Sequence, residues 1–280
     1  MAYLIIFLSL YAVYCGLLYF FQTKLMFPAD FAGPAGSTLP TAETERIELP
    51  TDQGKTVAWF VPAPAPGRGN GTTQPMPLVV FFHGNAELID HQRFIIDLYH
   101  GAGVSVLLVE YRGYGDSDGT PSQKHIVADT LAVLTDVLER EDVDADRLVL
   151  HGRSIGGGMA AQVALRTEPK ALIVESTFTS VSGMAWRYGV PPFLVRSPLN
   201  SAEAFKELDV PILIMHGRDD EVVPAAHAGK LDEAANDSTL VYFNAQHNTL
   251  PNGDEVQTYE YEVAKHLDRA GILGAPSVSE

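Results

Sequence analysis

The sequence predicts an α/β fold with a doubly wound, mostly parallel sheet, because strand-like and helix-like segments alternate along most of its 280 residues. Several of the predicted strands are apolar on consecutive positions, which is typical of parallel strands covered by helices on both faces. A third observation is a glycine-rich turn around Ser154, which directly follows one strand and precedes a helix. In such a sheet ligands bind beyond the carboxyl ends of the strands, so we expect the functional residues there.

Composition and charge narrow the function classes. Apolar residues make up 46% of the chain, which is ample for a sizeable core. The formal net charge is −16, from 19 basic and 35 acidic residues. This balance argues against nucleic acid as a partner, because phosphates are bound by basic faces. The single cysteine, Cys15, excludes a disulfide within the chain. Composition does not define an oligomeric state.

The first 27 residues differ in kind from the rest. Ala2 to Phe21 is a run of 20 uncharged residues, which as a helix would span about 30 Å, the thickness of a bilayer's hydrocarbon core. Tyrosines and phenylalanines gather toward its second half and Lys24 follows, as at a membrane interface. A cleaved signal peptide is the main alternative, but the segment lacks a basic start and a small-residue cleavage site. A buried core helix is a third. We therefore predict an uncleaved, single-pass membrane anchor over residues 1–27, with the side of the membrane undetermined.

The remaining chain divides into a tether, one domain and a tail. Residues 28–45 are predicted as a tether, because Pro28 to Pro40 is rich in glycine, proline and alanine. The domain is expected over residues 46–272, with a surface loop at 62–77, and a tail follows at 273–280. Its predicted strands lie at residues 56–61, 78–82, 104–109, 148–150, 171–174, 210–215 and 240–243.

Helical patterns separate these strands, at residues 93–100, 122–140, 157–167, 202–208, 225–235 and 256–270. The turn residues Thr120, Pro121 and Ser122 favour the start of the second helix. Between Thr177 and Asp209, only residues 184–194 are left for an excursion from the sheet. This short aromatic stretch is predicted to be a minimal lid, or an apolar lip that faces a membrane.

The turn around Ser154 carries the strongest chemical signal. A buried strand, a tight turn and a helix start would lift the Ser154 hydroxyl above the sheet and aim a helix N-terminus at it. The same G-x-S-x-G spacing also surrounds Ser117, but Thr120 and Pro121 follow there instead of an apolar helix. Flanking aspartates would also oppose the loss of a proton from Ser117. We therefore predict Ser154 as a nucleophile and Ser117 as a polar loop residue.

A serine nucleophile needs a base and an acid that orients the base. A serine hydroxyl is almost wholly protonated at neutral pH, so a histidine within hydrogen-bond reach must take its proton. His247 is the best candidate, because it follows the last predicted strand in a loop over the sheet edge. The acid is expected at Asp219 or Asp220, between which spacing does not choose, with Glu175 as a third possibility. The order serine, acid, histidine is that of one class of hydrolases.

Acyl transfer also needs donors oriented toward the developing oxyanion. The N–H of Ile155, the residue after the nucleophile, is the expected first donor. The second is expected from the backbone of Asn85, with Ala86 as the near alternative. Asn85 belongs to the first of three His-Gly pairs that end predicted strands, at His83, His151 and His216. For His151 and His216 we expect structural roles.

These residues resemble the α/β-hydrolase domain-containing proteins, in particular the membrane-anchored branch with a serine-aminopeptidase-like hydrolase domain. The motifs that carry the resemblance are Gln22–Pro28, His83–Ala86, Glu110–Gly115, Gly152–Gly157, Glu175–Ser180 and His216–Pro224. The resemblance implies an α/β-hydrolase fold, Asp220 as the acid and a structural role for Glu175. Because relatives include protein depalmitoylases, it also implies acyl esters or thioesters at a membrane, from lipids or acylated proteins.

The expected function is therefore that of a serine hydrolase with an acyl-enzyme intermediate, which needs neither a metal nor an organic cofactor. A peptidase or amidase would use the same three residues. A metallohydrolase built on His83, His151 and His216 is disfavoured, because no recognised zinc spacing such as H-E-x-x-H occurs. The remaining alternative is a noncatalytic, membrane-tethered binding module.

Overall fold

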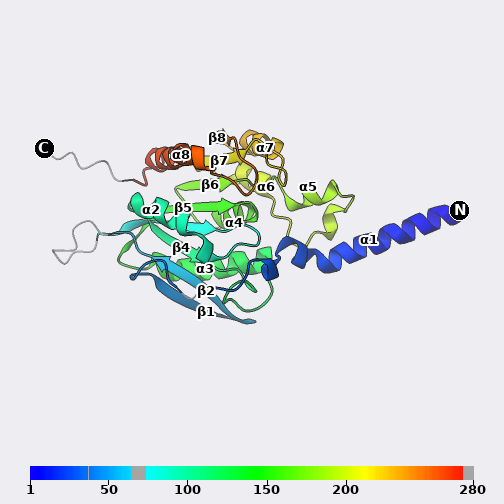
Figure 1. Ribbon diagram of the computed structural model, residues 1–280, viewed down its shortest axis with the longest axis horizontal. Helices are drawn as coiled ribbons and strands as arrows, with labels where there is room; N and C mark the ends of the chain where they lie inside the picture. Colours follow the sequence, from blue (N-terminus) through cyan, green and yellow to red (C-terminus); the bar gives the residue numbers. More distant parts are fainter. Residues whose placement is uncertain (37, 65–73, 274–280) are drawn as a thin grey trace.

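The computed structural model describes residues 1–36, 38–64 and 74–273 (Figure 1). An eight-stranded sheet has the order β1-β2-β4-β3-β5-β6-β7-β8. β1 pairs with β2, and β2 with β4, in antiparallel fashion, and all other neighbours are parallel. This confirms the predicted mostly parallel sheet. The strands are β1 Glu45–Thr51, β2 Gly54–Val61, β3 Met76–Phe82, β4 Ser105–Val109, β5 Val143–Arg153, β6 Ala171–Glu175, β7 Ile212–Gly217 and β8 Ser238–Phe243.

Helices cover both faces of the sheet, as the consecutive apolar positions predict. One core lies under α2 (Arg93–Gly101) and α8 (Val256–Arg269). The other core takes side chains from the four helices α3 Gln123–Leu138, α4 Ile155–Ala164, α6 Ser201–Glu207 and α7 Ala226–Ala234. β6 shows why two helical layers are needed, because it is buried at each of its five positions. A strand with no exposed face needs a helical layer on each side.

Most predicted elements shift by only a few residues. Ser122 ends up as the N-cap of α3, where its hydroxyl accepts the His125 N–H at 3.1 Å. β1 was not predicted, since its residues alternate between exposed and half-buried and include Pro50. Such a sequence suits an edge strand that pairs on one side only. The predicted loop at 62–77 and the predicted tail lie largely outside the described residues, and Met76 already begins β3.

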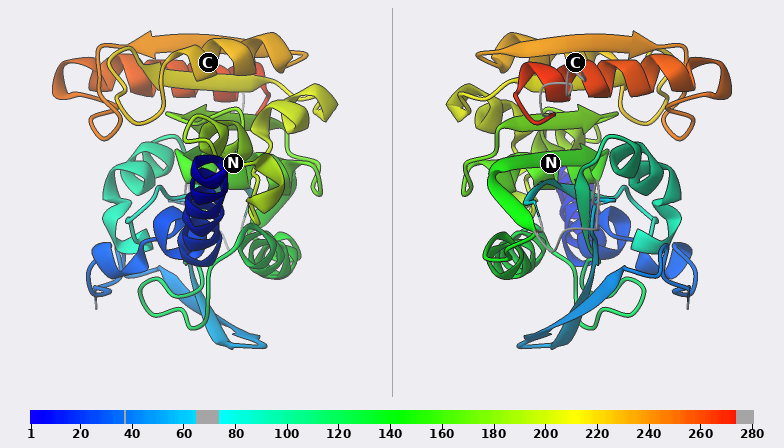
Figure 2. Two further views of the ribbon diagram at one scale, coloured as in Figure 1. Left: turned by 90° about the vertical axis from the view of Figure 1, so that its right-hand side faces the viewer. Right: turned by 90° about the vertical axis from the view of Figure 1, so that its left-hand side faces the viewer.

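The N-terminal segment forms one long helix, α1 (Ala2–Met26). By length and composition it could cross a membrane, and a signal sequence would pass the same test. α1 projects from the body of the molecule, and Figure 2 shows it end-on in front of the sheet. The segment predicted as a tether begins with a short 3-10 helix, η1 (Ala29–Phe31). Phe27 and Ala32 on either side are buried in the core, so the first part of this segment is packed onto the domain.

The short excursion after β6 contains α5 (Val181–Trp186) and the 3-10 helix η3 (Pro192–Leu194). It lies beside α1 in Figure 1 and returns to the sheet through α6. We call residues 181–196 the lid. The structure therefore has a short lid in place of a large cap domain, as the sequence predicts.

Candidate active site

Ser154 lies on a strained turn between β5 and α4. Its backbone angles are φ 53° and ψ −116°, a conformation that residues other than glycine rarely adopt. The end of β6 holds this turn from the side. The Ser154 N–H donates to the Glu175 carbonyl at 2.8 Å, and the Ser154 carbonyl accepts the Thr177 hydroxyl at 2.7 Å. The neighbouring strand therefore fixes the direction in which the Ser154 side chain leaves the sheet.

Gly156 shows how closely α4 packs on the next strand. A β-carbon at this position would lie 2.6 Å from the His83 carbonyl oxygen and closer still to that of Phe82. Only glycine allows this approach. As a result, the N-terminus of α4 and the turn that follows β3 lie side by side.

Three residues from separate strand ends meet at this edge. The Nε2 of His247 lies 3.0 Å from the Ser154 Oγ, and its Nδ1 lies 2.8 Å from the Asp220 Oδ2. All three residues are buried, with 8%, 9% and 7% exposure for Ser154, His247 and Asp220. Because a carboxylate only accepts hydrogen bonds, the network assigns the proton to Nδ1 and leaves Nε2 to accept from the serine.

The backbone after β7 brings Asp220, and not Asp219, into contact with His247. Asp220 turns inward, and its Oδ1 accepts the N–H groups of Val222 at 2.9 Å and Val223 at 2.7 Å. Asp219 is exposed. Burial alone would raise the pKa of the Asp220 carboxyl, but hydrogen bonds from His216, His247 and Val223 hold it well below its usual range. Asp220 is therefore held as a carboxylate beside His247.

A second close approach joins the acid turn to the histidine loop. A β-carbon on Gly217 would lie 2.8 Å from the Ala245 carbonyl carbon. The same two segments exchange backbone hydrogen bonds, from Arg218 to Phe243 at 2.8 Å and from Asp219 to Ala245 at 3.2 Å. The distance between Asp220 and His247 is thus set by backbone contacts.

Glu175, the third candidate acid, has a different partner. Its Oε1 accepts from the Arg153 Nε at 2.9 Å, and Arg153 also lies 3.6 Å from Glu87. Burial raises the pKa of the Glu175 carboxyl, and the Arg153 charge opposes that rise. Arg153 therefore bridges two acids directly beside Ser154. We did not predict this role from the sequence, although a lone arginine next to Ser154 and a strand ending in Glu175 were its signals.

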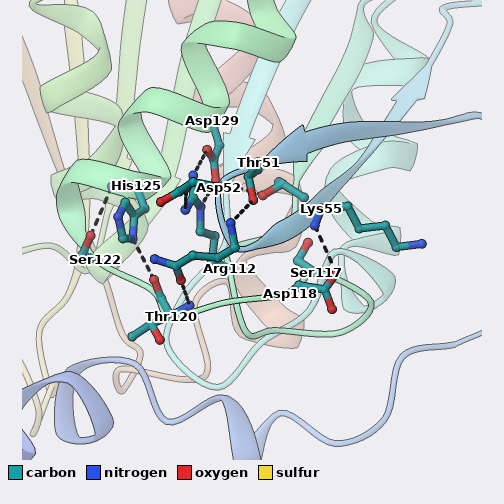
Figure 3. Close-up of polar contacts among 12 residues, drawn as sticks. Thr51, Asp52, Lys55, Arg112, Ser117, Asp118, Thr120, Ser122, His125 and Asp129 are labelled. Atoms are coloured by element: carbon teal, nitrogen blue, oxygen red, sulfur yellow. Dashed lines mark hydrogen bonds and ion pairs between the residues drawn. The ribbon is translucent and has the colours of Figure 1, made fainter.

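Ser117, in the second G-x-S-x-G match, is part of a polar network in the loop between β4 and α3 (Figure 3). Its hydroxyl accepts the Val57 N–H at 2.9 Å and faces the Glu110 carbonyl at 3.4 Å. Nearby, Arg112 donates to both carboxylate oxygens of Asp129, at 2.7 and 2.8 Å. Ser117 is buried. Its contacts agree with a structural role.

The turn after β3 is held by a buried pair. The His83 Nε2 lies 3.0 Å from the Glu110 Oε1, and the His83 ring stacks on Tyr111 with centroids 3.8 Å apart. Beyond it, the Gly84 N–H donates to Glu87 at 3.1 Å, and Asn85 is exposed. On the other side, the Ile155 N–H is the first of α4, so the helix offers it no acceptor. The oxyanion roles of Asn85 and Ile155 remain predictions.

The other two His-Gly histidines are also buried. The His151 Nδ1 lies 2.8 Å from the Tyr99 hydroxyl. The His216 Nε2 lies 2.8 Å from the Val223 carbonyl and 3.3 Å from the Asp220 Oδ2. His216 thus touches the candidate acid, a contact that the sequence analysis missed and that the four-residue spacing to Asp220 could have signalled. Within the described residues, no three histidine, cysteine or acidic side chains are grouped to hold a metal ion.

A mostly parallel sheet with a serine on a strand-to-helix turn defines the α/β-hydrolase class. The chain belongs to the α/β-hydrolase domain-containing family. It is 34% identical over 236 residues to the alpha/beta hydrolase domain-containing protein WAV2 of Arabidopsis thaliana, covering 75% of this chain and 74% of the relative. It is 30% identical to the protein bem46 of Schizosaccharomyces pombe, covering 75% and 73%. Residues 73–198 match the hydrolase family described as serine aminopeptidase, S33.

Solved structures share the fold. An α/β hydrolase from Vibrio vulnificus superimposes with a TM-score of 0.69 at 19% identity, covering 88% of this chain and 92% of the other. The esterase Pf2001 of Pyrococcus furiosus gives a TM-score of 0.66 at 19% identity, covering 84% and 94%. At this identity the likeness concerns the fold alone.

Proposed function

We propose that this protein is a serine hydrolase that cleaves acyl ester or thioester bonds, with Ser154 as nucleophile, His247 as base and Asp220 as the acid that orients the base. One observation carries the proposal. A continuous hydrogen-bonded chain runs from the Ser154 Oγ through the two ring nitrogens of His247 to the Asp220 Oδ2, with lengths of 3.0 and 2.8 Å. This is the arrangement that converts a serine hydroxyl into a nucleophile at neutral pH.

In the first half of the reaction, the Ser154 Oγ attacks the acyl carbonyl carbon while the His247 Nε2 takes the hydroxyl proton. The carbonyl oxygen becomes an oxyanion, which the N–H groups of Ile155 and Asn85 are proposed to stabilise. When the carbonyl re-forms, the leaving alcohol or thiol receives the proton from His247, and the acyl group stays on Ser154. Asp220 stabilises the imidazolium that exists between these steps.

In the second half, a water molecule attacks the acyl-enzyme. His247 takes a proton from the water and returns it to the Ser154 Oγ as the ester bond to the serine breaks. The products are a carboxylic acid and the free enzyme. Every proton in this cycle moves through one imidazole, so the reaction requires no second proton carrier.

The proposed substrates are acyl esters or thioesters of lipids or acylated proteins, met at a membrane to which α1 anchors the chain as a single span. Two features support this. α1 is long and apolar enough to cross a bilayer. The lid carries the exposed aromatic residues Trp186, Tyr188 and Phe193. Large exposed apolar groups of this kind mark contact with a partner or a membrane.

A fluorophosphonate probe tests the nucleophile in the full chain, solubilised in lipid nanodiscs. We expect the wild-type protein and Ser117→Ala to become labelled, and Ser154→Ala to remain unlabelled. Ser117 is the matched control because it has the same five-residue pattern in a structural setting. Absence of labelling in folded wild-type protein, or labelling of Ser154→Ala, would overturn the proposal and favour a binding module.

The match to a family described as serine aminopeptidase makes amide hydrolysis the second candidate. The same triad cleaves both bonds, so the leaving group decides between them. p-Nitrophenyl esters and amino-acid p-nitroanilides, compared on one preparation, separate the two. We expect turnover of the ester and none of the anilide, and cleavage of the anilide that is lost in Ser154→Ala would assign a peptidase.

A further inference from the structure

A cavity of about 510 Å³ lies between α1 and the lid. Its volume falls within the range of about 300–1,000 Å³ typical of small-molecule sites. Leu18, Leu25 and Met26 of α1 form one wall, and Val181, Met184 and Leu194 of the lid form another. None of the described side chains that line it carries a charge. The lining therefore suits an apolar ligand.

Hydrogen bonds from α1 hold the lid in place. The Tyr11 hydroxyl donates to the Gly189 carbonyl at 2.6 Å, and the Tyr14 hydroxyl donates to the Tyr188 carbonyl at 2.9 Å. Further along, the Gln22 side chain donates to the Leu194 carbonyl at 3.0 Å. A backbone carbonyl without a partner costs several kcal/mol in a hydrocarbon environment. These three bonds therefore satisfy carbonyl groups of the lid that would otherwise lack a partner in a hydrocarbon environment.

The position of these contacts along α1 sets the depth of the cavity. They begin at Tyr11 and end at Gln22, a stretch of about 16 Å along a helix. The uncharged run of α1 extends from Ala2 to Phe21. The tip of the lid thus lies beside the middle of the apolar run. The α1 wall of the cavity runs from Tyr14 to Met26, so with α1 inserted in a bilayer the cavity would extend from the depth of the acyl chains to the interface.

The lid also begins where the nucleophile is held. Thr177, whose hydroxyl bonds to the Ser154 carbonyl, lies only four residues before the start of α5 at Val181. Figure 1 shows α5 on the side of the sheet from which α1 projects. The cavity and Ser154 are therefore on the same side of the molecule, joined by a short segment.

From these observations we propose that the cavity between α1 and the lid binds the acyl chain of the substrate. The inference rests on the proposed function for the cleavage step, and it assigns α1 a second role as one wall of the substrate site. The occupant is an acyl chain, because the lining is mostly apolar and the amide of Gln22 is already bonded to Leu194 and Arg196. A charged headgroup has no partner inside and stays outside.

The neighbouring leucines of α1 give a matched pair of variants. Leu18 lines the cavity, whereas Leu17 does not and is 55% exposed. The measurement is the ratio of kcat/KM for p-nitrophenyl octanoate to that for p-nitrophenyl acetate, in the full chain in nanodiscs. Each buried methylene is worth about a fourfold gain. If the indole of Leu18→Trp displaces two methylenes, the ratio falls by about sixteenfold.

We expect Leu17→Trp to keep the wild-type ratio. Equal ratios for wild type and both variants, or equal losses in both variants, would show that the acyl chain binds elsewhere. Using a ratio removes any general loss of activity from the comparison.

A binding experiment separates this inference from the cleavage step. A fatty acid with a terminal diazirine is photo-activated on Ser154→Ala protein in nanodiscs, and the adducts are mapped by mass spectrometry. We expect adducts on both α1 and lid peptides, with those on the lid reduced several-fold by Leu18→Trp and unchanged by Leu17→Trp. Lid adducts that ignore Leu18→Trp would refute the cavity as the site, whether or not Ser154 is a nucleophile.

Discussion

Replacing Asp220 by asparagine tests the proposed role of the acid most sharply. The Asp220 Oδ1 accepts two backbone N–H groups, from Val222 and Val223. In Asp220→Asn the amide oxygen must take this place, because an NH₂ group cannot accept hydrogen bonds from the two N–H groups. The NH₂ group then faces the Nδ1 of His247. Since it can only donate, Nδ1 must lose its proton and accept, and the proton moves to Nε2.

This change converts the imidazole of His247 to the other tautomer, with its proton on the nitrogen that faces Ser154. A protonated Nε2 cannot take the proton of Ser154, so the base is lost while every residue keeps its place. In a serine protease the corresponding wrong tautomer lowers kcat by about 10⁴, which is about 5 kcal/mol of barrier. We expect a loss of the same order for Asp220→Asn.

The assay is hydrolysis of p-nitrophenyl butyrate at saturating substrate, with Asp219→Asn as the matched control. Asp219 is the preceding residue, of the same chemistry, and is exposed. We expect Asp219→Asn to retain kcat within about threefold, the scatter usual for surface changes of up to 0.5 kcal/mol. A kcat for Asp220→Asn within tenfold of the wild type, at an unchanged melting temperature, would refute the tautomer argument.

Three further changes have defined outcomes. Arg153→Met leaves the buried Glu175 without its cation, so the free energy of unfolding in urea should fall by about 3–5 kcal/mol; the added change Glu175→Gln should restore part of it. Burial lowers the pKa of His266 to about 4, whereas it is about 6.5 in the unfolded chain. Between these two pH values only the unfolded chain binds the proton. The free energy of unfolding therefore falls by roughly 3 kcal/mol as the pH drops from about 6.5 to about 4. His266→Gln should flatten this dependence of the melting temperature. Ser117→Ala should lower the free energy of unfolding by about 1–3 kcal/mol, because the buried Val57 N–H loses its acceptor.

Each of these outcomes has a clear opposite. A stable Arg153→Met protein would mean that water or another cation reaches Glu175. An unchanged slope of melting temperature against pH in His266→Gln would place the acid sensitivity in another group. Loss of fluorophosphonate labelling in folded Ser117→Ala would return this serine to the catalytic candidates.

The sequence predicts the sheet because consecutive apolar residues have only one good solution, a parallel strand with helices on both sides. It also predicts Ser154 and His247, because each follows a strand whose carboxyl end must reach the same edge. Spacing does not choose between Asp219 and Asp220, and in the sequence only the family resemblance points to Asp220. Both residues follow β7, and Asp220 is held inward by the N–H groups of Val222 and Val223 and by the close approach of Gly217 to the distant Ala245.

Other features depend on contacts that no local pattern contains. β1 is a polar edge strand, stabilised by one antiparallel neighbour, so its alternation of half-buried residues is weak. The role of Arg153 requires two acids from different parts of the chain. The packing of Phe27 into the core was hidden because it follows an apolar run that is expected to end at a membrane interface.

The contacts between α1 and the lid have a practical consequence for biochemists. A protein shortened by its first 26 residues would lose its apolar helix but keep all residues of the sheet, together with Ser154, Asp220 and His247. It would lack the tyrosine hydroxyls that bond to Tyr188 and Gly189. The lid would face water with its carbonyls and with the apolar surface that α1 covers. If the cavity between α1 and the lid binds the acyl chain, as we propose, chain-length preferences measured on the shortened protein would describe a different substrate site from that of the intact chain.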